Sequence, residues 1–310
     1  MHLALANNNN KMTGKPDPSV YLPFHYIPTE WVGITFLVLF SITTATHLFE
    51  AVYFKTRYML PTLVFCGVLE VIGWGARHWG HVSPHSENAN TMQLVTTILA
   101  PSFMTAGMFL LLPKIIRELG TQYSRMPPRM YLIIFGTVDL VTLVIQSVGG
   151  AKASLSNSLE DANKGGEIML GGISLQLAAL TLYAALGLEF VIRYGLNRPV
   201  GADSGNHERK YAGWGGAPRK LVLMLIGLAI ATVFVLIRSV YRTLELSDGW
   251  QVNGTINATE KWFNWFDGMP ITVAMFTFNV FHPGYLLSDI QEGLPPSARA
   301  SKEDIEASQA

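Results

Sequence analysis

Three charged residues follow the sixth apolar run of the chain at helical spacing. The run LVLMLIGLAIATVFVLI (221–237) contains no charge and is followed by Arg238, Arg242 and Glu245. At about 100° per residue in an α-helix, these positions fall within an arc of roughly 60°, so their side chains project in one direction. Guanidinium groups bind phosphates and carboxylates, whereas a carboxylate binds a cationic amine. The stripe therefore indicates either a site for charged headgroups or an internal ion-pair lock.

Polar side chains also lie inside other apolar stretches of the sequence. A charged side chain at the centre of a bilayer costs about 2.5–3.5 kcal/mol, so it faces either the protein interior or water. If the chain spans a membrane, one polar cavity open to the outer side satisfies all of these groups together. The residues that we expect to line this cavity are Glu70, Arg77, Asp139, Gln146, Gln176, Arg238, Arg242, Glu245 and Asp267.

The same residues also admit a purely structural interpretation. Arg77 and Glu245, near the membrane surface, can lock neighbouring helices by ion pairs without binding any ligand. Asp139 and Gln146 lie on one helical face and are compatible with a hydrogen bond between packed helices. Both interpretations stay open, and cavity lining is favoured most for the deeper residues Glu70 and Arg238.

A second, smaller polar group lies toward the opposite ends of the apolar runs. His47 and Glu50 share a helical face, while Asn279 and His282 come late in the last run. Pro and Gly follow His282 directly, which predicts a helix break at this point. We expect a capping or interfacial role for His282 rather than ligand binding. Two polar groups separated by apolar layers would resemble a gated path.

The elements that must position these residues are membrane-spanning helices. The 310-residue chain is 49% hydrophobic and only 14% charged, whereas soluble domains carry about 25% charged residues. Runs of about 20 apolar residues are long enough to cross the hydrocarbon core of a bilayer. The sequence therefore predicts an all-α membrane protein, a bundle of seven transmembrane helices, over residues 31–53, 59–79, 92–113, 130–150, 168–192, 219–241 and 266–288.

Two signals give this bundle an orientation. The connectors after the first, third and fifth spans hold 12 lysines and arginines, against six in the N-terminal tail and the other two connectors. The positive-inside rule then places the N-terminus outside and the C-terminus in the cytoplasm. The sequons at Asn253 and Asn257 lie in the 6–7 connector, on the side predicted to be external, and we expect glycosylation there.

We expect three regions along the chain. Residues 29–290 form the transmembrane domain, between a disordered extracellular tail over 1–28 and a disordered cytoplasmic tail over 291–310. Both tails are polar and lack the apolar periodicity of a packed helix. The first tail also lacks the apolar core of a signal peptide.

Several classes of chemistry lack their sequence signals. The chain contains no GxxxxGK[ST] loop, so ATP is not its energy source, whereas downhill movement and proton coupling through a carboxylate both stay open. His78, His81 and His85 share a face only if a helix continues through Pro84, and no serine elbow occurs. A formal net charge of zero gives no bias toward nucleic acid. We therefore predict no enzyme activity, no cofactor and no bound metal.

Six stretches together carry a family resemblance: EVIGWGAR (70–77), ILAPSFMTAGMFLLLPKII (98–116), DLVTLVIQSVGG (139–150), RSVYRTLE (238–245), EKWFNWFD (260–267) and HPG (282–284). On these motifs, over roughly residues 30–290, the chain resembles the RTA1-like family of fungal seven-helix membrane proteins, also called the lipid-translocating exporter family. Two departures are visible, because Trp74 replaces the family's usual tyrosine and Ala151 follows Gly150. Either could alter substrate shape, so Trp74 joins the predicted ligand-binding residues.

What the resemblance implies is movement of amphiphiles. Members of the family are linked to export of sphingoid bases, to resistance to toxic or drug-like amphiphiles, and in one branch to porphyrin movement. The leading hypothesis is therefore binding and translocation or export of an amphiphilic lipid, such as a sphingoid base or a phospholipid, through the outer polar cavity. A cationic amine would bind Glu70, Asp139 or Asp267, while Arg238 and Arg242 would hold a phosphate or carboxylate.

The alternative is a seven-helix receptor or lipid sensor that signals through its cytoplasmic loops. The 5–6 connector, RYGLNRPVGADSGNHERKYAGWGGAPRK (193–220), is long and basic enough to engage a cytoplasmic protein partner. A solvated loop that simply follows the positive-inside rule is the simpler interpretation of the same segment. Under either hypothesis the chain is an integral, multi-pass protein, and we expect it in the plasma membrane, in contact with the bilayer and with a membrane lipid or an amphiphilic small molecule.

Overall fold

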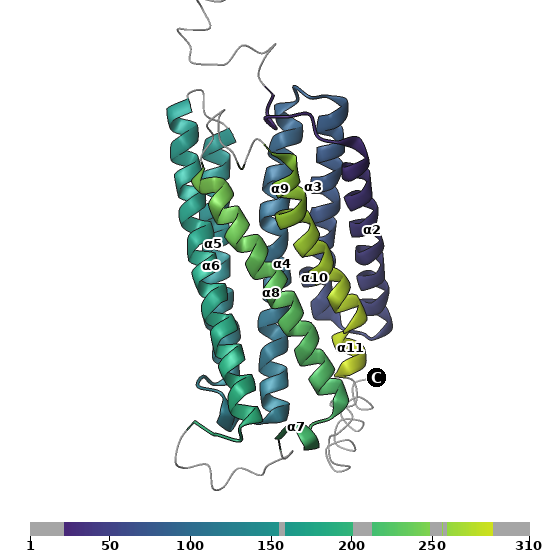
Figure 1. Cartoon of the computed structure of the whole chain (residues 1–310), viewed down its shortest axis with the longest axis vertical. Coiled ribbons are helices and arrows are strands. Elements are labelled where there is room, and N and C mark those ends of the chain that lie inside the picture. Colours follow the sequence, from purple (N-terminus) through teal and green to yellow (C-terminus); the bar gives the residue numbers. More distant parts are fainter. Residues whose placement is uncertain (1–21, 155–158, 201–212, 249–255, 257–258, 288–310) are drawn as a thin grey trace, which may run out of the picture.

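Long helices that run side by side set the long axis of the molecule (Figure 1). The computed structural model describes residues 22–154, 159–200, 213–248, 256 and 259–287. Within these ranges the chain forms α-helices, short 3₁₀ and π-helical turns and connecting loops, and it forms no strand. The prediction of an all-helical protein is confirmed.

Among the described residues, six helical segments are long and apolar enough to cross a membrane. The second of them is continuous through a 3₁₀ turn η1 (Arg57–Met59), a π-helix η2 (Leu60–Val64) and α3 (Phe65–Val82). The others are α2 (Glu30–Tyr53), α4 (Glu87–Leu119), α5 (Pro128–Ser154), α6 (Leu159–Gly195) and α8 (Arg219–Ser247). Their outward faces carry aliphatic side chains, such as Val144 and Leu182 at 54% and 55% exposure. Such apolar outer faces suit lipid rather than water, so the chain is an integral, multi-pass membrane protein.

The helices extend beyond the predicted apolar runs at several ends. α4 begins five residues before the predicted start at 92, because the side chain of Ser86 caps it by accepting a hydrogen bond of 3.3 Å from the Ala89 amide. An N-cap serine satisfies one of the free amides of the first turn, and hydropathy does not reveal it. The apolar runs therefore predict the spans, and local capping decides their ends.

The segment from Glu260 to Val280 is helical without interruption but changes its geometry. It comprises α9 (Glu260–Phe263), a π-helix η5 (Asn264–Gly268) and α10 (Met269–Val280). Its 21 residues at about 1.5 Å per residue give a length close to the roughly 30 Å of a bilayer core. This segment is therefore the candidate for the seventh span. The span predicted over 266–288 stays a prediction.

A helix break follows α10, as the His-Pro-Gly sequence predicts. Pro283 begins the short helix α11 (Pro283–Leu286), and His282 precedes it in an extended conformation. The Gly284 amide donates a hydrogen bond of 3.1 Å to His282 Nδ1, so this side chain caps α11.

α4 is the central helix of the bundle and packs against α3, α5 and α8. α5 and α6 lie against each other along much of their length, and glycines permit this close approach. A Cβ atom at Gly149 would come within 2.8 Å of the Gly165 carbonyl oxygen, and one at Gly172 within 2.9 Å of Gln146 Cγ. Small residues allow helix backbones to approach in this way inside a membrane.

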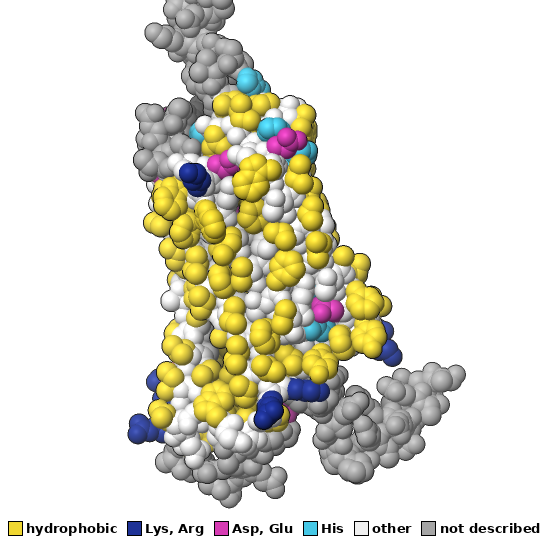
Figure 2. All heavy atoms as spheres, turned by 45° about the vertical axis from the view of Figure 1, so that its right-hand side comes forward, with side chains coloured by type: hydrophobic (Ala, Val, Ile, Leu, Met, Phe, Trp, Pro, Cys, Tyr) yellow, Lys and Arg dark blue, Asp and Glu magenta, His cyan; other side chains and the backbone are white. Residues whose placement is uncertain are grey.

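We name the two ends of the bundle by their place in Figure 1. The upper end holds the start of α2 and the end of α8, and the lower end holds the end of α4 and the start of α8. Figure 2 shows Lys and Arg side chains gathered mainly toward the lower end, most of the visible histidines near the upper end, and a broad apolar surface between the two ends.

Residues 22–29 form a segment that we call the N-terminal strap, which lies across the upper end. Phe24 is buried against Gly80, and His81 Nδ1 lies 2.8 Å from the Pro28 carbonyl oxygen. The rest of the predicted N-terminal tail (1–21) and the predicted C-terminal tail (291–310) lie outside the described residues.

Candidate functional site

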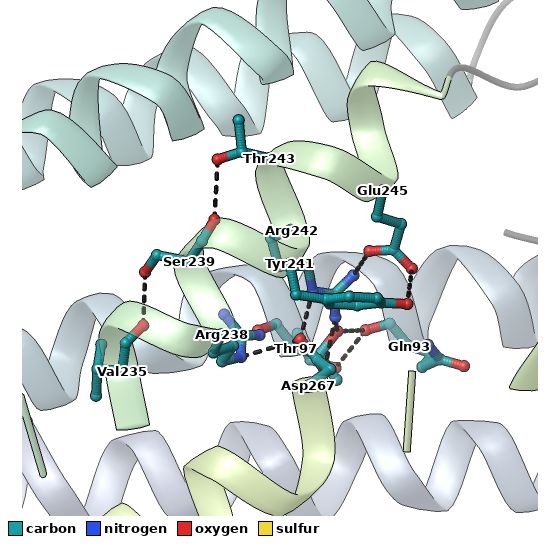
Figure 3. A network of polar contacts seen from close by, with 11 residues as sticks. Gln93, Thr97, Val235, Arg238, Ser239, Tyr241, Arg242, Thr243, Glu245 and Asp267 are labelled. Atoms are coloured by element: carbon teal, nitrogen blue, oxygen red, sulfur yellow. Dashed lines mark hydrogen bonds and ion pairs between the residues drawn. The ribbon is translucent and has the colours of Figure 1, made fainter. Parts of the chain in front are cut away.

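The arginine stripe of α8 contacts an aspartate of the π-helix η5. Arg242 Nε donates a hydrogen bond of 2.5 Å to Asp267 Oδ1, and its Nη2 donates one of 2.9 Å to Oδ2 (Figure 3). Arg238 Nε lies 3.0 Å from Asp267 Oδ1. All three side chains are buried, at 4% exposure or less. Two guanidinium groups therefore share one carboxylate in the bundle interior, which gives each of these buried charges an ionic partner.

Two further side chains complete the surroundings of Arg242. Its Nη1 donates a hydrogen bond of 2.8 Å to Glu245 Oε2, and its Nη2 donates one of 2.8 Å to Thr97 Oγ1 on α4. The Thr97 carbonyl oxygen accepts a hydrogen bond from Arg238 Nη2. We call Arg238, Arg242, Glu245, Asp267 and Thr97 the arginine cluster, and Figure 3 shows Arg242 between Asp267 and Glu245. Sequence reasoning missed Thr97, because a single threonine in an apolar helix is unremarkable.

Arg77 forms a separate contact between α3, α9 and the N-terminal strap. It is buried, and its Nη2 donates hydrogen bonds to Glu260 Oε1 at 3.0 Å and to the Tyr26 hydroxyl oxygen at 2.8 Å. Glu260 also accepts hydrogen bonds from the amide and the hydroxyl of Thr29, at 2.8 and 2.5 Å. We call these four residues the Arg77 clasp. Burial raises the pKa of the Tyr26 hydroxyl, against the opposing effect of the Arg77 guanidinium, so that Tyr26 stays neutral near pH 7.

The arginine cluster and the Arg77 clasp border one pocket at the upper end. The pocket has a volume of about 70 Å³, and the strap residues Pro23 to Tyr26 form one of its walls. Arg77, Arg242, Glu245 and Phe263 form much of the remaining lining. This space accommodates a few water molecules, whereas pockets for small-molecule ligands typically enclose about 300–1,000 Å³. The predicted residues Arg77, Arg242 and Glu245 thus face one common but small space.

Glu70 and Trp74 lie one helical turn apart on α3 and are both fully buried. Glu70 Oε1 and Trp74 Nε1 have no hydrogen-bond partner among the described residues. Glu70 lies within electrostatic reach of Arg238 and Asp267 but forms no direct ion pair in the described part of the chain. The Trp74 ring stacks on Phe36, with ring centroids 4.1 Å apart. The structure therefore places Glu70 near the arginine cluster but leaves its Oε1 without a hydrogen-bond partner among the described residues.

Asp139, Gln146 and Gln176 come together in a third arrangement, deeper in the bundle, between α4, α5 and α6. Gln176 Nε2 donates a hydrogen bond of 2.7 Å to Asp139 Oδ1, and Gln146 Nε2 donates one of 2.8 Å to Gln176 Oε1. The Thr105 hydroxyl lies 2.9 Å from Asp139 Oδ2. A small pocket of about 10 Å³ lies between the two glutamines and Arg238 and Arg242. Arg242 therefore borders both pockets.

Three residues of the lower polar group, His47, Glu50 and His282, also come together, and the fourth, Asn279, bonds separately to α2. Glu50 Oε2 lies 3.6 Å from His47 Nδ1 and 3.8 Å from His282 Nε2. Asn279 Nδ2 donates a hydrogen bond of 2.7 Å to Thr43 Oγ1 across the α2–α10 interface. This group ties α2 to α10 and α11 near the lower end. It is separate from the arginine cluster.

Two other predictions concern metals and glycans. Among the described residues, no group of three or more His, Cys, Asp or Glu side chains is arranged to hold a metal ion. His81 instead contacts the Pro28 carbonyl oxygen and lies 3.7 Å from Glu30. The sequons at Asn253 and Asn257 lie outside the described residues.

Comparison with known proteins identifies relatives over most of the chain. The sphingoid long-chain base transporter RSB1 of Saccharomyces cerevisiae is 25% identical over 295 residues, which cover 88% of this chain and 76% of the relative. The probable lipid transporter atnI of Emericella nidulans is 25% identical over 87% of this chain and 69% of the relative. Protoporphyrin uptake protein 1 of S. cerevisiae is 20% identical over 84% of this chain and 92% of the relative.

No solved structure matches the chain. The family model described as RTA1 like protein matches residues 63–290, which include α3, the arginine stripe of α8, and α10. The predicted resemblance over roughly residues 30–290 covers the whole of this range. The chain belongs to the RTA1-like family.

Proposed function

We propose that this protein moves an amphiphilic lipid, such as a sphingoid base or a phospholipid, across its membrane, and that the arginine cluster binds the headgroup. The names of two relatives, a sphingoid long-chain base transporter and a probable lipid transporter, support lipid as the substrate class. The observation that carries the proposal is a buried set of both charge signs that borders a pocket at the upper end. Under this proposal the protein is a transporter and not an enzyme.

The arginine cluster suits a headgroup that carries a phosphate, an amine or both. A phosphate would take the place of Glu245 on the Arg242 guanidinium, because its oxygen can accept the Nη1 hydrogen bond that Glu245 Oε2 now accepts. A long-chain amine would pair with Glu245 or Asp267, or with Glu70, whose Oε1 has no hydrogen-bond partner among the described residues. When a phosphate replaces Glu245 on Arg242, the amine of a zwitterionic headgroup can pair with the released Glu245, so that neither charge stays unpaired. Movement therefore needs no large electrostatic penalty.

Entry of a lipid requires the upper pocket to widen. At about 70 Å³ the pocket is too small for a headgroup, and the strap residues Pro23 to Tyr26 form one wall of it. Release of the Arg77 clasp would loosen the strap, because the Tyr26 hydroxyl and the amide and hydroxyl of Thr29 bond to residues of that clasp. We therefore assign the described conformation to a closed state. The lower polar group around Glu50 is the corresponding closure at the other end.

The proposed membrane topology has seven spans, an external upper end and a cytoplasmic lower end. The concentration of Lys and Arg toward the lower end supports this orientation (Figure 2). External sequons at Asn253 and Asn257 and residence in the plasma membrane belong to the same proposal. A cytoplasmic partner of the 5–6 connector is a further prediction, and residues 201–212 of this connector lie outside the described residues.

The test of this function is lipid movement in proteoliposomes. Labelled sphingoid base and labelled phospholipid are supplied on one side, and their transfer is followed for the wild type, Glu245→Gln and Arg242→Gln. We expect movement by the wild type and a loss of at least tenfold in both variants, each shown to be folded by its thermal transition. The matched control is Arg129→Gln, which removes an exposed arginine at the start of α5 and should leave the rate unchanged.

Two outcomes contradict the proposal. Binding of either lipid without movement by the wild type would favour the receptor or lipid-sensor alternative. Movement that persists in both variants would show that the arginine cluster is a structural lock and that the headgroup binds elsewhere.

A further inference from the structure

The carboxyl group of Asp139 lies in the middle of α5 without a cationic partner. It is 7% exposed, and no ion pair of the described residues includes it. The helices packed against α5 are α4 and α6, and they present Thr105, Ser102 and Gln176 to this region. None of these three side chains titrates near physiological pH. Arg238 and Arg242 of α8 line the small pocket on the other side of the two glutamines and are paired with Asp267.

The Thr105 hydroxyl has two acceptors within reach but only one hydrogen. Its oxygen lies 2.9 Å from the Ser102 carbonyl oxygen and 2.9 Å from Asp139 Oδ2. When Asp139 is ionised, Thr105 can donate to Oδ2 and leaves the carbonyl group. When Asp139 is protonated, its own O–H can donate to Thr105, which then donates to the Ser102 carbonyl oxygen. Both protonation states are satisfied with the heavy atoms in the same places.

The other oxygen of Asp139 keeps one partner in both states. Gln176 Nε2 donates hydrogen bonds to Asp139 Oδ1 at 2.7 Å and to Ser102 Oγ at 3.0 Å. Gln176 Oε1 in turn accepts from Gln146 Nε2, so the orientation of this amide is fixed from both sides. The only group that must turn when Asp139 gains or loses a proton is therefore the Thr105 hydroxyl.

A physical connection runs from Asp139 to the arginine cluster. Gln146 and Gln176 line the pocket of about 10 Å³ that also contacts Arg238 and Arg242. Gln146 is 2% exposed, and its Oε1 has no hydrogen-bond partner among the described residues. A space of this size is close to the minimum for one water molecule, which could join Gln146 Oε1 to a guanidinium group.

We propose that Asp139 is a membrane-embedded proton-binding site, and that the proton it binds is coupled to movement of the amphiphile at the arginine cluster. The coupling rests on the proposed function, whereas the proton site does not. In the closed state the carboxyl group is protonated, because an ionised carboxylate without a cationic partner is costly inside a membrane. When the bundle opens and water reaches the small pocket, Asp139 releases its proton, and the Gln146–Gln176 contact passes the change to Arg238 and Arg242.

The proton site is tested without any lipid substrate. Infrared spectra of the purified protein in nanodiscs are recorded over a pH series for the wild type, Asp139→Asn and Glu167→Gln. We expect the wild type to show the carbonyl band of a protonated carboxylic acid that is lost as pH rises. The component of this band that comes from Asp139 should be absent in Asp139→Asn and unchanged in Glu167→Gln, which alters an exposed carboxylate on α6. Asparagine preserves both hydrogen bonds of the protonated acid, so this variant should fold.

The coupling is tested in proteoliposomes with labelled phosphatidylcholine and labelled sphingoid base. If one proton moves with each lipid, a gradient of one pH unit should drive up to about tenfold accumulation in the wild type. Asp139→Asn should still equilibrate lipid without a gradient but should lose the accumulation. The same variant corrects for passive redistribution of the titratable amine.

Each outcome decides one part of the proposal. A wild-type spectrum without a band that depends on Asp139 would overturn the proton site. Lipid movement that is equal with and without the gradient would overturn the coupling and leave the proposed function standing. Failure of the wild type to move either lipid would overturn the proposed function and the coupling together, while the infrared series still decides the proton site.

Discussion

Asp267 is the shared partner of Arg238 and Arg242, so its loss affects both arginines. Its two carboxylate oxygens accept hydrogen bonds from Arg242, and one of them also lies 3.0 Å from Arg238. Loss of Asp267 therefore leaves two buried guanidinium groups with reduced compensation. Loss of Arg238 leaves an Asp267–Arg242 pair with both of its hydrogen bonds intact. The three residues are all buried, but their removal has unequal consequences.

We predict that Asp267→Asn destabilises the protein more than Arg242→Gln, and Arg242→Gln more than Arg238→Gln. Breaking a buried ion pair from one side typically costs about 3–5 kcal/mol, because the remaining charge loses its partner. Asp267→Asn should reach this range, and Arg238→Gln should fall below it. The measurement is thermal unfolding in detergent micelles. Arg129→Gln, which removes an exposed charge, should stay within about 0.5 kcal/mol of the wild type. A reversed order of the three variants would contradict this assignment of partners.

The sequence predicts the α8 residues of this cluster better than it predicts their partners on other helices. Helical periodicity decides that Arg238, Arg242 and Glu245 share a face, and the cost of buried charge predicts that a carboxylate must meet them. It does not decide which carboxylate, because the partner comes from another helix. Thr97 could not be predicted, since threonines commonly bond their own backbone. Its hydroxyl does donate to the Gln93 carbonyl oxygen, at 2.9 Å, and the lone pair left over accepts from Arg242.

At the scale of the elements, one of the two π-helices in the described residues positions a side chain of the arginine cluster, whereas η2 (Leu60–Val64) carries none. The π-helix η5 (Asn264–Gly268) contains Asp267 and continues directly into α10. A π turn holds one residue more than an α turn and rotates the following residues about the helix axis, and such turns are frequent at functional sites. The sequence predicted a helix here, because its apolar run is clear. The π turn could not be predicted, since it depends on the packing of Asp267 against α8.

Two adjacent glycines of α6 give a direct test of the α5–α6 contact. A Cβ atom at Gly172 would lie 2.9 Å from Gln146 Cγ and 3.2 Å from the Thr142 carbonyl oxygen, whereas one at Gly171 would meet nothing within 4 Å. We predict that Gly172→Ala destabilises the protein by about 1–3 kcal/mol, because a backbone contact cannot relax as a side chain can. Gly171→Ala should be neutral or slightly stabilising, since alanine favours a helix.

Thermal unfolding of the two glycine variants under the same conditions provides the comparison. Gly172→Ala also displaces Gln146, so it should disturb the Asp139 arrangement, whereas Gly171→Ala should leave it intact. Equal stability of the two variants would show that α5 and α6 are farther apart than described.

At the scale of the whole molecule, the polar groups lie at different depths, and the upper ones border common pockets. The Arg77 clasp and the arginine cluster border the upper pocket, and the small pocket lies between the cluster and the Asp139 arrangement. The His47–Glu50–His282 group ties α2 to α11 near the lower end. The residues of the two predicted polar groups therefore lie in separate regions, and those of the upper group divide into several parts. That division could not be predicted, because a sequence indicates the depth of a residue in the membrane but not which neighbouring helices its side chain faces.

The proposed orientation of the bundle follows from the basic residues of its lower end, and the cysteine content of the chain makes it testable. The sole cysteine, Cys66, is fully buried, so it should give no background with a membrane-impermeant maleimide. Asn88 is exposed at the upper start of α4, and Arg129 is exposed at the lower start of α5. We predict that intact cells label Asn88→Cys, and that Arg129→Cys is labelled only after the membrane is permeabilised. The wild type serves as the unlabelled control. Labelling of Arg129→Cys alone in intact cells would invert the bundle, and the pocket beside Arg242 would then open to the cytoplasm and favour uptake from that side.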